Sequence, residues 1–301
     1  MLKRTITGAV ILAVTLIFVI LKQYSDLFFD AYVLIMSYAS LIEVASAYKL
    51  SSKKVNLPLL LFIPAVMCLI VNLANSRYDV FIYQMLTAII ILIISLTCEI
   101  IVFARNRKHG TTEKKLYILN QSLFEVTKNT MMVFAYPLLP LTFIFVLNHM
   151  PYDVGYIGII LAFAISMLTD TCAYLFGRAF GKHKFIPEVS PKKTIEGVVG
   201  GFVGGLVGGM GCFLVFKYTS LFNLLALGPT MPVIIIIFIV VSLVGSYINQ
   251  LGDLIASAFK RKGGIKDFSN IFPGHGGFMD RIDGLMFTST FIYIIFALFL
   301  V

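Results

Sequence analysis

The chain is divided into apolar stretches of about 20 residues, and this pattern restricts its fold more than any other feature of the sequence. A transmembrane helix needs about 20 mostly apolar residues. By that measure the sequence predicts nine spans, with the ranges 5–21, 27–47, 57–75, 80–103, 130–148, 154–177, 197–216, 232–259 and 284–301. Pro137 and Pro140 interrupt the fifth. We therefore expect an all-α, polytopic integral membrane protein.

The composition excludes a water-soluble enzyme. Of the 301 residues, 59% are hydrophobic and 13% are charged, whereas a soluble domain carries roughly 25% charged residues. Disorder is excluded as well, because it requires low hydrophobicity. Lys3 and Arg4 precede the first apolar stretch as in a signal peptide, but no small-residue cleavage site follows at 21–26. We therefore interpret the first stretch as an uncleaved anchor.

The basic residues predict the orientation. The formal net charge is +9. If the segments between successive predicted spans are numbered as loops in chain order, 21 of the 24 Lys and Arg residues lie at the N-terminus or in even-numbered loops. Cytoplasmic loops carry an excess of Lys and Arg, so we expect a cytoplasmic N-terminus and an outer C-terminus. This one-sided excess is explained by topology and an anionic substrate, so we expect no nucleic-acid partner.

The long cytoplasmic loops indicate where chemistry takes place. We expect an N-terminal membrane region at 1–129 with about four helices. A C-terminal catalytic region at 130–301, with about five helices, carries the long loops 178–196 and 260–283. No clear internal repeat of the kind found in many transporters is evident.

The glycines of the seventh span recur every four residues, at 197, 200/201, 204/205 and 208/209. On a helix they form one smooth face suited to close helix packing. A phosphate-binding loop is the alternative, but the sequence has no GxxxxGK[ST] and predicts no strand before the run. The four cysteines lie in apolar runs without metal-ligand spacing and are interpreted as buried apolar residues.

Carboxylates inside membrane spans are costly and usually functional. Asp170 and Asp253 lie well inside the sixth and eighth spans, about two helical turns from their cytoplasmic ends. Helical spacing places Asp170, Tyr174 and Arg178 on one stripe. The remaining acidic residues in spans, Asp30, Glu43 and Glu99, are better explained as interfacial or paired groups.

Residues 253–283 combine four Asp, five Lys or Arg, one His and five Gly. Hard cations such as Mg²⁺ take oxygen ligands and bridge to substrate phosphates, and Lys and Arg neutralise the remaining phosphate oxygens. The glycines at 274, 276 and 277 allow close approach of the backbone to an anion. The segment therefore predicts a metal–phosphate site.

The same segment resembles the signature of phosphatidate cytidylyltransferases, also called CDP-diacylglycerol synthases. The similarity rests on Ser257, Lys260-Arg261, Lys266-Asp267, Pro273-Gly-His-Gly-Gly277 and Asp280-Arg-x-Asp283, and upstream on Asp170-Thr171, Gly177-Arg178 and Ser190-Pro-Lys-Lys-Thr-x-Glu-Gly197. The resemblance implies a membrane enzyme that makes CDP-diacylglycerol and pyrophosphate from CTP and phosphatidate. It also implies a homodimer, Mg²⁺ and a second cation such as K⁺.

From the residue types we assign roles within this site. Asp253 and Asp280 are expected to hold the metal, with Asp283 and Asp170 as further ligands, and Lys260 and Arg281 join Asp253 and Asp280 as catalytic residues. The other substrate-binding candidates fall into three groups by chemistry: phosphate-binding Lys192, Lys193, Arg261 and Lys266; hydrogen-bond donors Ser190, Thr194, Ser257 and His275; and orienting Glu196 and Asp267.

Other functions remain open at this point. A CTP-dependent lipid kinase or a cytidylyltransferase for another lipid phosphate would use similar residues. A transporter would use Asp170 and Asp253 as coupling sites, although its site would lie nearer the midplane. We expect the enzyme in the cell membrane, with its active site facing the cytoplasm, because phosphatidate stays in the bilayer and CTP is cytosolic.

Overall fold

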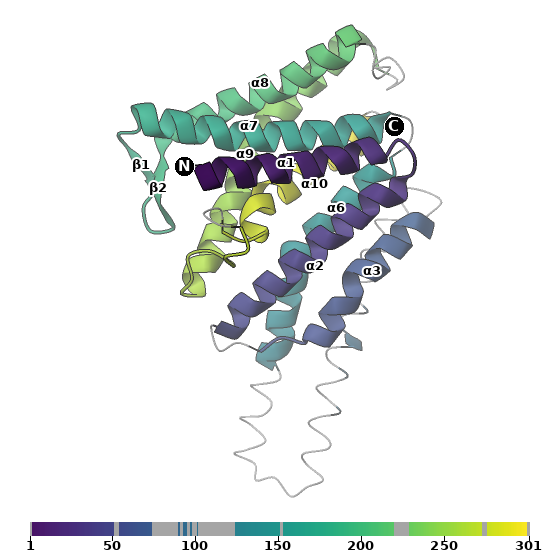
Figure 1. Ribbon diagram of the computed structural model, residues 1–301, viewed down its shortest axis with the longest axis vertical. Helices are drawn as coiled ribbons and strands as arrows, with labels where there is room; N and C mark the ends of the chain where they lie inside the picture. Colours follow the sequence, from purple (N-terminus) through teal and green to yellow (C-terminus); the bar gives the residue numbers. More distant parts are fainter. Residues whose placement is uncertain are drawn as a thin grey trace, which may run out of the picture.

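The computed structural model describes residues 2–50, 54–73, 124–150, 153–219, 229–272 and 276–299, with isolated positions between 90 and 101. Its helices (Figure 1) are α1 (Leu2–Leu21), α2 (Asp26–Leu50), α3 (Leu57–Leu73), α6 (Leu139–Asn148), α7 (Val154–Phe180), α8 (Ile195–Thr219), α9 (Met231–Lys262) and α10 (Met279–Phe299). A π-helical segment, η1 (Phe134–Leu138), precedes α6, and two short strands, β1 (Lys184–Ile186) and β2 (Ser190–Thr194), connect α7 to α8.

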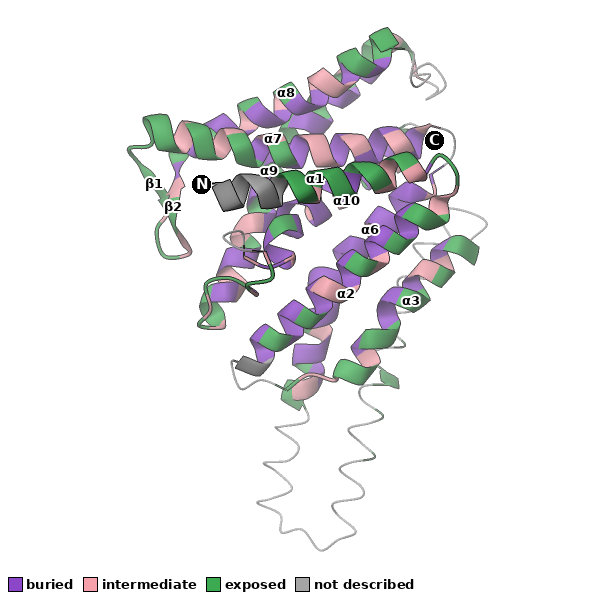
Figure 2. Cartoon of the chain, viewed as in Figure 1, coloured by how far each residue is buried: buried purple, intermediate pink, exposed green. Residues whose placement is uncertain are grey.

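The all-α membrane architecture is confirmed. Within the described residues, six helices are long and apolar enough to cross a membrane, and the apolar helices at Ala9–Leu21 and Leu57–Leu73 are shorter. Most of the predicted span 80–103 lies outside the described residues, so the count of nine stays a prediction. Many large apolar residues are exposed, as lipid contact requires. Figure 2 shows exposed residues, in green, along helices such as α1, α3 and α8.

A kink just before Pro137 divides the fifth predicted span into two helical parts. The span runs from Phe124 to Asn148. Its middle is π-helical at Phe134–Leu138, and Tyr136 has the non-helical angles φ −147° and ψ 110° just before Pro137. A proline disfavours helical geometry in the preceding residue and removes one backbone donor. The kink therefore follows directly from the sequence.

The glycines of α8 form two stripes rather than the one smooth face expected. A Cβ at Gly204 would overlap the carbonyl oxygen of Leu168 on α7. A Cβ at Gly205 would lie 2.5 Å from the Cβ of Ser246 on α9. The stripe facing α7 comprises Gly197, Gly200, Gly204 and Gly208, and the stripe facing α9 comprises Gly201, Gly205 and Gly209. Close packing is thus confirmed, and α8 contacts two helices at once.

The connection before α8 differs from the expectation of no strand. β1 and β2 pair antiparallel, with Lys184 opposite Thr194 and Ile186 opposite Ser190. This two-stranded hairpin lies at the end of α7 in Figure 1. The glycine run itself is helical and packed against neighbouring helices, so it does not form a phosphate loop.

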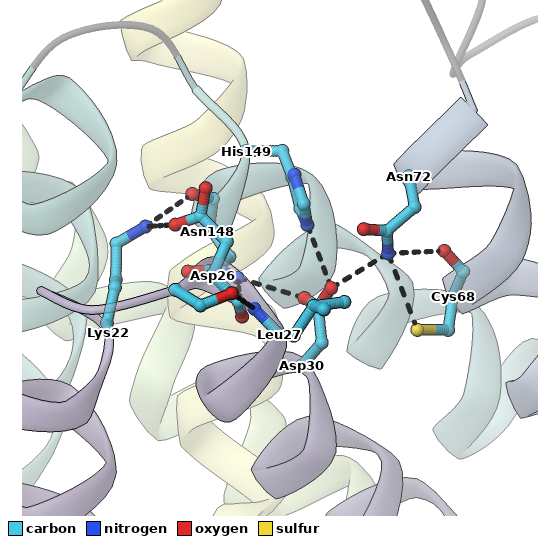
Figure 3. Close-up of polar contacts among 9 residues, drawn as sticks. Lys22, Asp26, Leu27, Asp30, Cys68, Asn72, Asn148 and His149 are labelled. Carbon is cyan, nitrogen blue, oxygen red and sulfur yellow. Dashed lines mark hydrogen bonds and ion pairs between the residues drawn. The ribbon is translucent and has the colours of Figure 1, made fainter.

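The contacts between loops divide the molecule into two ends. At one end, Asp30 of α2 accepts hydrogen bonds from Asn72, Asn148 and His149 (Figure 3). Asn72 lies at the C-terminal end of α3, and Asn148 and His149 lie at the C-terminal end of α6. The Nζ of Lys22 joins this cluster through the carbonyl of Asn148, at 2.7 Å. All of these groups belong to predicted odd-numbered loops or adjoin them.

The opposite end gathers the predicted even-numbered loops. The amide of Asn56 donates to Thr130 Oγ1 at 2.9 Å, and Asn129 donates to the carbonyl of Lys54. Arg261, at the end of α9, donates to the carbonyl of Val189 in the hairpin turn at 3.4 Å. Within the described residues, the contacts therefore join groups in or beside odd-numbered loops at one end and groups in or beside even-numbered loops at the other, as the distribution of charge predicts.

Candidate active site

A cavity of about 590 Å³ opens among the ends of α7, β2, α8, α9 and α10. Four carboxylates and four basic side chains lie on its wall. Its lining residues are Asp170, Ala173, Tyr174, Gly177, Arg178, Lys192, Lys193, Thr194, Gly197, Val198, Gln250, Asp253, Asp280, Arg281 and Asp283. A short segment of each of five elements thus contributes to one polar chamber within an apolar bundle.

Two of the carboxylates form ion pairs with lysines. Lys193 Nζ lies 2.8 Å from Asp253 Oδ2 and also donates to the carbonyl of Gln250 at 3.2 Å. Lys260 Nζ lies 2.6 Å from Asp280 Oδ1, and both side chains are buried. A buried charge is tolerated when it is paired and hydrogen-bonded. These pairs therefore explain how ionised side chains persist at this depth.

Asp280 is fixed on both of its oxygens. While Oδ1 faces Lys260, Oδ2 accepts backbone N–H groups from Phe268 at 2.9 Å and Gly277 at 2.8 Å. The Lys260 ammonium also lies 5.5 Å from the ring centre of Phe268. Asp280 thus holds the loop between α9 and α10 as well as facing the cavity.

Asp170 is oriented by a buried amide. Asn249 Nδ2 donates to Asp170 Oδ1 at 2.8 Å, and its own Oδ1 accepts from Ser166 Oγ at 2.6 Å. Asn249 is fully buried. The Ser166–Asn249–Asp170 chain therefore connects α7 to α9 and sets the direction of the Asp170 carboxylate.

Asp283 has the least compensated charge of the four. It is buried, and no Lys, Arg or His in the described ranges lies within ion-pair distance of it. It accepts a hydrogen bond from the adjacent N–H of Gly284 at 2.8 Å. A buried carboxylate either becomes protonated or is paired with a cation, and this arrangement fits a cation that enters the cavity.

The acidic side chains do not form a closed metal cage. Across the described ranges, no group of three or more His, Cys, Asp or Glu side chains is placed to hold a metal ion by itself. Mg²⁺ is commonly bound by one or two carboxylates together with substrate phosphates and water. The donor set therefore fits a cation that binds jointly with a phosphorylated substrate.

Three cations on the cavity wall are available to an anion. Arg178, Lys192 and Arg281 are exposed to the cavity, and none of them forms an ion pair with a described residue. Arg and Lys bind phosphate through charge-assisted hydrogen bonds. One chamber thus combines free cations with carboxylates, as the metal–phosphate interpretation requires.

The structure brings many of the predicted site residues together. Asp170, Asp253, Asp280 and Asp283 share the wall with Lys192, Lys193, Thr194 and Arg281. Lys260 lies behind Asp280 as its ion-pair partner. Thr194 also has a structural position, because its Oγ1 accepts the N–H of Gly197 at 3.1 Å and so caps α8.

Other predicted residues lie outside this cavity. Arg261 contacts the hairpin turn, and Glu196 pairs with His183 at 2.7 Å. Ser257 is buried within α9, Ser190 lies in the hairpin, and Lys266 and Asp267 are exposed in the loop after α9. His275 lies outside the described residues.

Sequence reasoning assigned no site role to several cavity residues. Tyr174 and Arg178 are on the wall with Asp170, as the helical stripe placed them, yet neither was among the candidates. Gln250 was also missed, although it precedes Asp253 by less than one turn of α9. Helical spacing puts Gln250 or Asn249 on one stripe with Asp253, but the hydrogen bond from Asn249 to Asp170 arises only through the fold, so no local pattern predicts that contact.

Comparison with known proteins gives a consistent result. The family model of the cytidylyltransferase family matches residues 2–299. A phosphatidate cytidylyltransferase of Bacillus subtilis is 37% identical over 157 residues, which cover 52% of this chain and 53% of that protein. Phosphatidate cytidylyltransferases of Staphylococcus haemolyticus and Staphylococcus aureus (strain COL) are 42% and 43% identical over 129 residues, each match covering 43% of this chain and 45% of the relative.

In these matches the chain spans about half the length of the curated relatives. The family model, in contrast, extends over nearly the whole chain, including every element that lines the cavity. The chain therefore belongs to the cytidylyltransferase family.

Proposed function

We propose that this protein transfers the cytidylyl group of CTP to phosphatidate, giving CDP-diacylglycerol and pyrophosphate. The observation that carries the proposal is that one cavity holds both four carboxylates and three cations, Arg178, Lys192 and Arg281. None of these three cations forms an ion pair with a described residue. Membership of the cytidylyltransferase family and the names of the similar proteins support the choice of nucleotide and lipid.

The chemistry requires little from a general base. An oxygen of the phosphatidate phosphate attacks the α-phosphorus of CTP, and the bond from that phosphorus to the bridging oxygen of the β-phosphate breaks. A phosphate monoester has a second pKa near 6, so the nucleophile is already mostly dianionic at neutral pH. Arg178, Lys192 and Arg281 would bind and orient the two anions, as positioning and charge neutralisation dominate phosphoryl transfer.

We propose that Mg²⁺ is the cofactor. Asp253 and Asp283 would hold it, with Asp170 beside them on the same wall. Asp280, which is expected from the sequence to be a ligand together with Asp253, would contribute less directly, because both of its oxygens already have partners. When bound, the ion neutralises charge on the triphosphate and its leaving pyrophosphate. A second cation such as K⁺ remains an expectation from the resemblance. Lys193 and Lys260 keep Asp253 and Asp280 in place through their ion pairs.

The position of the cavity suits both substrates. It lies at the ends of α7 and α9, at the end of the molecule where the even-numbered loops meet. We propose that this end faces the cytoplasm of a cell membrane, since it carries most of the basic residues. The homodimer implied by the resemblance stays a prediction, which light scattering of the detergent-solubilised protein would measure.

The test is turnover by the purified protein with radiolabelled CTP, phosphatidate and Mg²⁺, with the product identified by mass spectrometry. Asp253→Asn should lower CDP-lipid formation by about 100-fold or more, the scale of losing one electrostatic contact to the transition state. Glu125→Gln is the control, because Glu125 is exposed and pairs with Lys128 away from this cavity.

Each other outcome contradicts the proposal in a different way. Full activity of Asp253→Asn would remove that residue from the site. Formation of CDP and a lipid with one additional phosphate, instead of pyrophosphate and a CDP-lipid, would identify a CTP-dependent lipid kinase. Uptake of an organic anion into proteoliposomes without turnover would identify a transporter.

A further inference from the structure

Glu43 is a buried carboxylate of α2 that contacts the loop after α9 and the start of α10. Its Oε1 accepts from Ser269 Oγ at 2.5 Å and from the N–H of Phe278 at 2.8 Å, and its Oε2 accepts the N–H of Met279 at 2.7 Å. Only 3% of Glu43 is exposed. It therefore connects the N-terminal helices to the segment that carries Asp280.

These contacts satisfy a specific need of α10. The first N–H groups of a helix have no partner inside the helix, and a negative charge at this end interacts favourably with the helix dipole. Glu43, which lies on another helix, supplies the hydrogen-bond acceptor and the negative charge for the N–H groups of Phe278 and Met279. Asp280 reaches back to Gly277 and completes the cap.

The glycine at position 277 fits this arrangement sterically. A Cβ there would lie 2.5 Å from Glu43 Oε2, so a larger residue would displace the carboxylate. The sequence suggested that these glycines let the backbone approach an anion. In the structure, the anions that approach them are Glu43 at Gly277 and Asp280 at Gly276.

We infer that Glu43 is a positioning residue, which holds the start of α10 so that Asp280 and Arg281 face the cavity. Glu43 does not line the cavity itself, so it acts through the backbone of Phe278 and Met279. This assigns a role in the site to α2, which the sequence alone left without one. The part of the inference that concerns catalysis rests on the proposed function.

The experiment measures amide hydrogen exchange of the full-length protein in detergent. Glu43→Gln keeps the shape of the side chain but removes its charge and turns an N–H₂ group toward N–H donors. The amides of Phe278 and Met279 should then exchange at least about tenfold faster, since hydrogen bonds to a charged acceptor are lost. Ser269→Ala removes one donor to Glu43 and should give a smaller change at the same amides.

Asp30→Asn is the matched control. Asp30 and Glu43 lie on the same helix, both are buried, and each accepts three hydrogen bonds from other elements. They are 13 residues apart, or roughly 20 Å along the helix. Asp30→Asn should leave the exchange of Phe278 and Met279 unchanged even if it lowers the melting temperature.

Turnover provides the second readout. Glu43→Gln should lower kcat by about tenfold or more, because Asp280 and Arg281 lose their fixed orientation. It should change the KM for CTP by less than about threefold, because Arg178 and Lys192 lie on other elements and stay in place. Unchanged exchange in both Glu43→Gln and Ser269→Ala would overturn the inference, as would equal acceleration in Asp30→Asn. If the wild type makes no CDP-lipid, the proposed function fails, and the exchange data still decide whether Glu43 anchors α10.

Discussion

Each carboxylate on the cavity wall has a different set of partners. Asp253 pairs with Lys193, Asp280 pairs with Lys260 and accepts two backbone amides, and Asp170 accepts from Asn249. A side chain with more fixed partners has less freedom to reorient when substrate binds. Among these residues Asp280 is therefore the most rigid, and its geometry depends on the backbone around it.

Gly276 is the residue on which this geometry depends most closely. Its φ is +80°, a region that side chains with a Cβ rarely adopt, and a Cβ there would lie 2.8 Å from Asp280 Oδ2. We predict that Gly276→Ala lowers CDP-lipid formation by at least about tenfold, because strain of about 1–2 kcal/mol is combined with displacement of Asp280. Turnover and thermal unfolding of the variant check this.

Gly264 provides the control for that prediction. Its φ is +67°, but nothing lies within 4 Å of the position of its Cβ. Gly264→Ala should therefore lose a similar amount of stability and keep its turnover. Equal loss of activity in both variants would mean that backbone strain alone, and not the contact with Asp280, is responsible.

At the residue scale, the sequence identifies groups by their chemistry and their spacing along one element. The Asp170–Tyr174–Arg178 stripe and the Lys192–Lys193 pair reach the cavity as helical spacing or adjacency suggested. From the sequence, Glu43 is explained as an interfacial or paired group. Its role could not be predicted, because its partner Phe278 is 235 residues away in the chain. Contacts between distant elements leave no local pattern, and both Glu43 and Asn249 were missed for that reason.

At the scale of the element, α8 shows how a four-residue period can encode three surfaces. The glycine stripe at 200, 204 and 208 contacts α7, and the stripe at 201, 205 and 209 contacts α9. Val199, Val203 and Val207 follow the same period and are exposed, as lipid contact requires. The repeat was visible in the sequence, but which neighbour each stripe meets depends on the packing of the whole bundle.

We predict that adding a single methyl group to the first stripe loosens the bundle. Gly204→Ala places a Cβ against the backbone of Leu168, two residues before Asp170. Such overpacking costs about 1–3 kcal/mol and should also reduce turnover, since α7 carries Asp170. Unfolding of the purified protein in mixed detergent micelles, together with the CTP assay, measures both effects.

Gly211 is the matched position on the same helix. Nothing lies within 4 Å of the position of its Cβ, and alanine is favoured over glycine inside a helix by roughly 0.5–1 kcal/mol. Gly211→Ala should therefore be neutral or stabilising. If Gly204→Ala were equally harmless, the close approach of α7 and α8 would not contribute to stability.

At the scale of the whole molecule, two independent observations divide the loops in the same way. The sequence places 21 of 24 basic residues at the N-terminus or in even-numbered loops. The structure joins odd-numbered loops through Asp30 and even-numbered loops through contacts such as Arg261 with Val189. The contacts say which loops share an end, whereas only the charges indicate which end is cytoplasmic.

Single cysteines at the two ends test that assignment. Tyr24 is 79% exposed in the turn between α1 and α2, and Lys182 is exposed beside the hairpin. In a background without the four native cysteines, Tyr24→Cys should react with a membrane-impermeant maleimide in intact cells, and Lys182→Cys should react only in inside-out vesicles. Permeabilised membranes, in which both should react, control for accessibility. Labelling of both positions from one side would contradict the grouping of the loops, whereas the reverse pattern would keep the grouping and place the cavity on the outer face, away from cytosolic CTP.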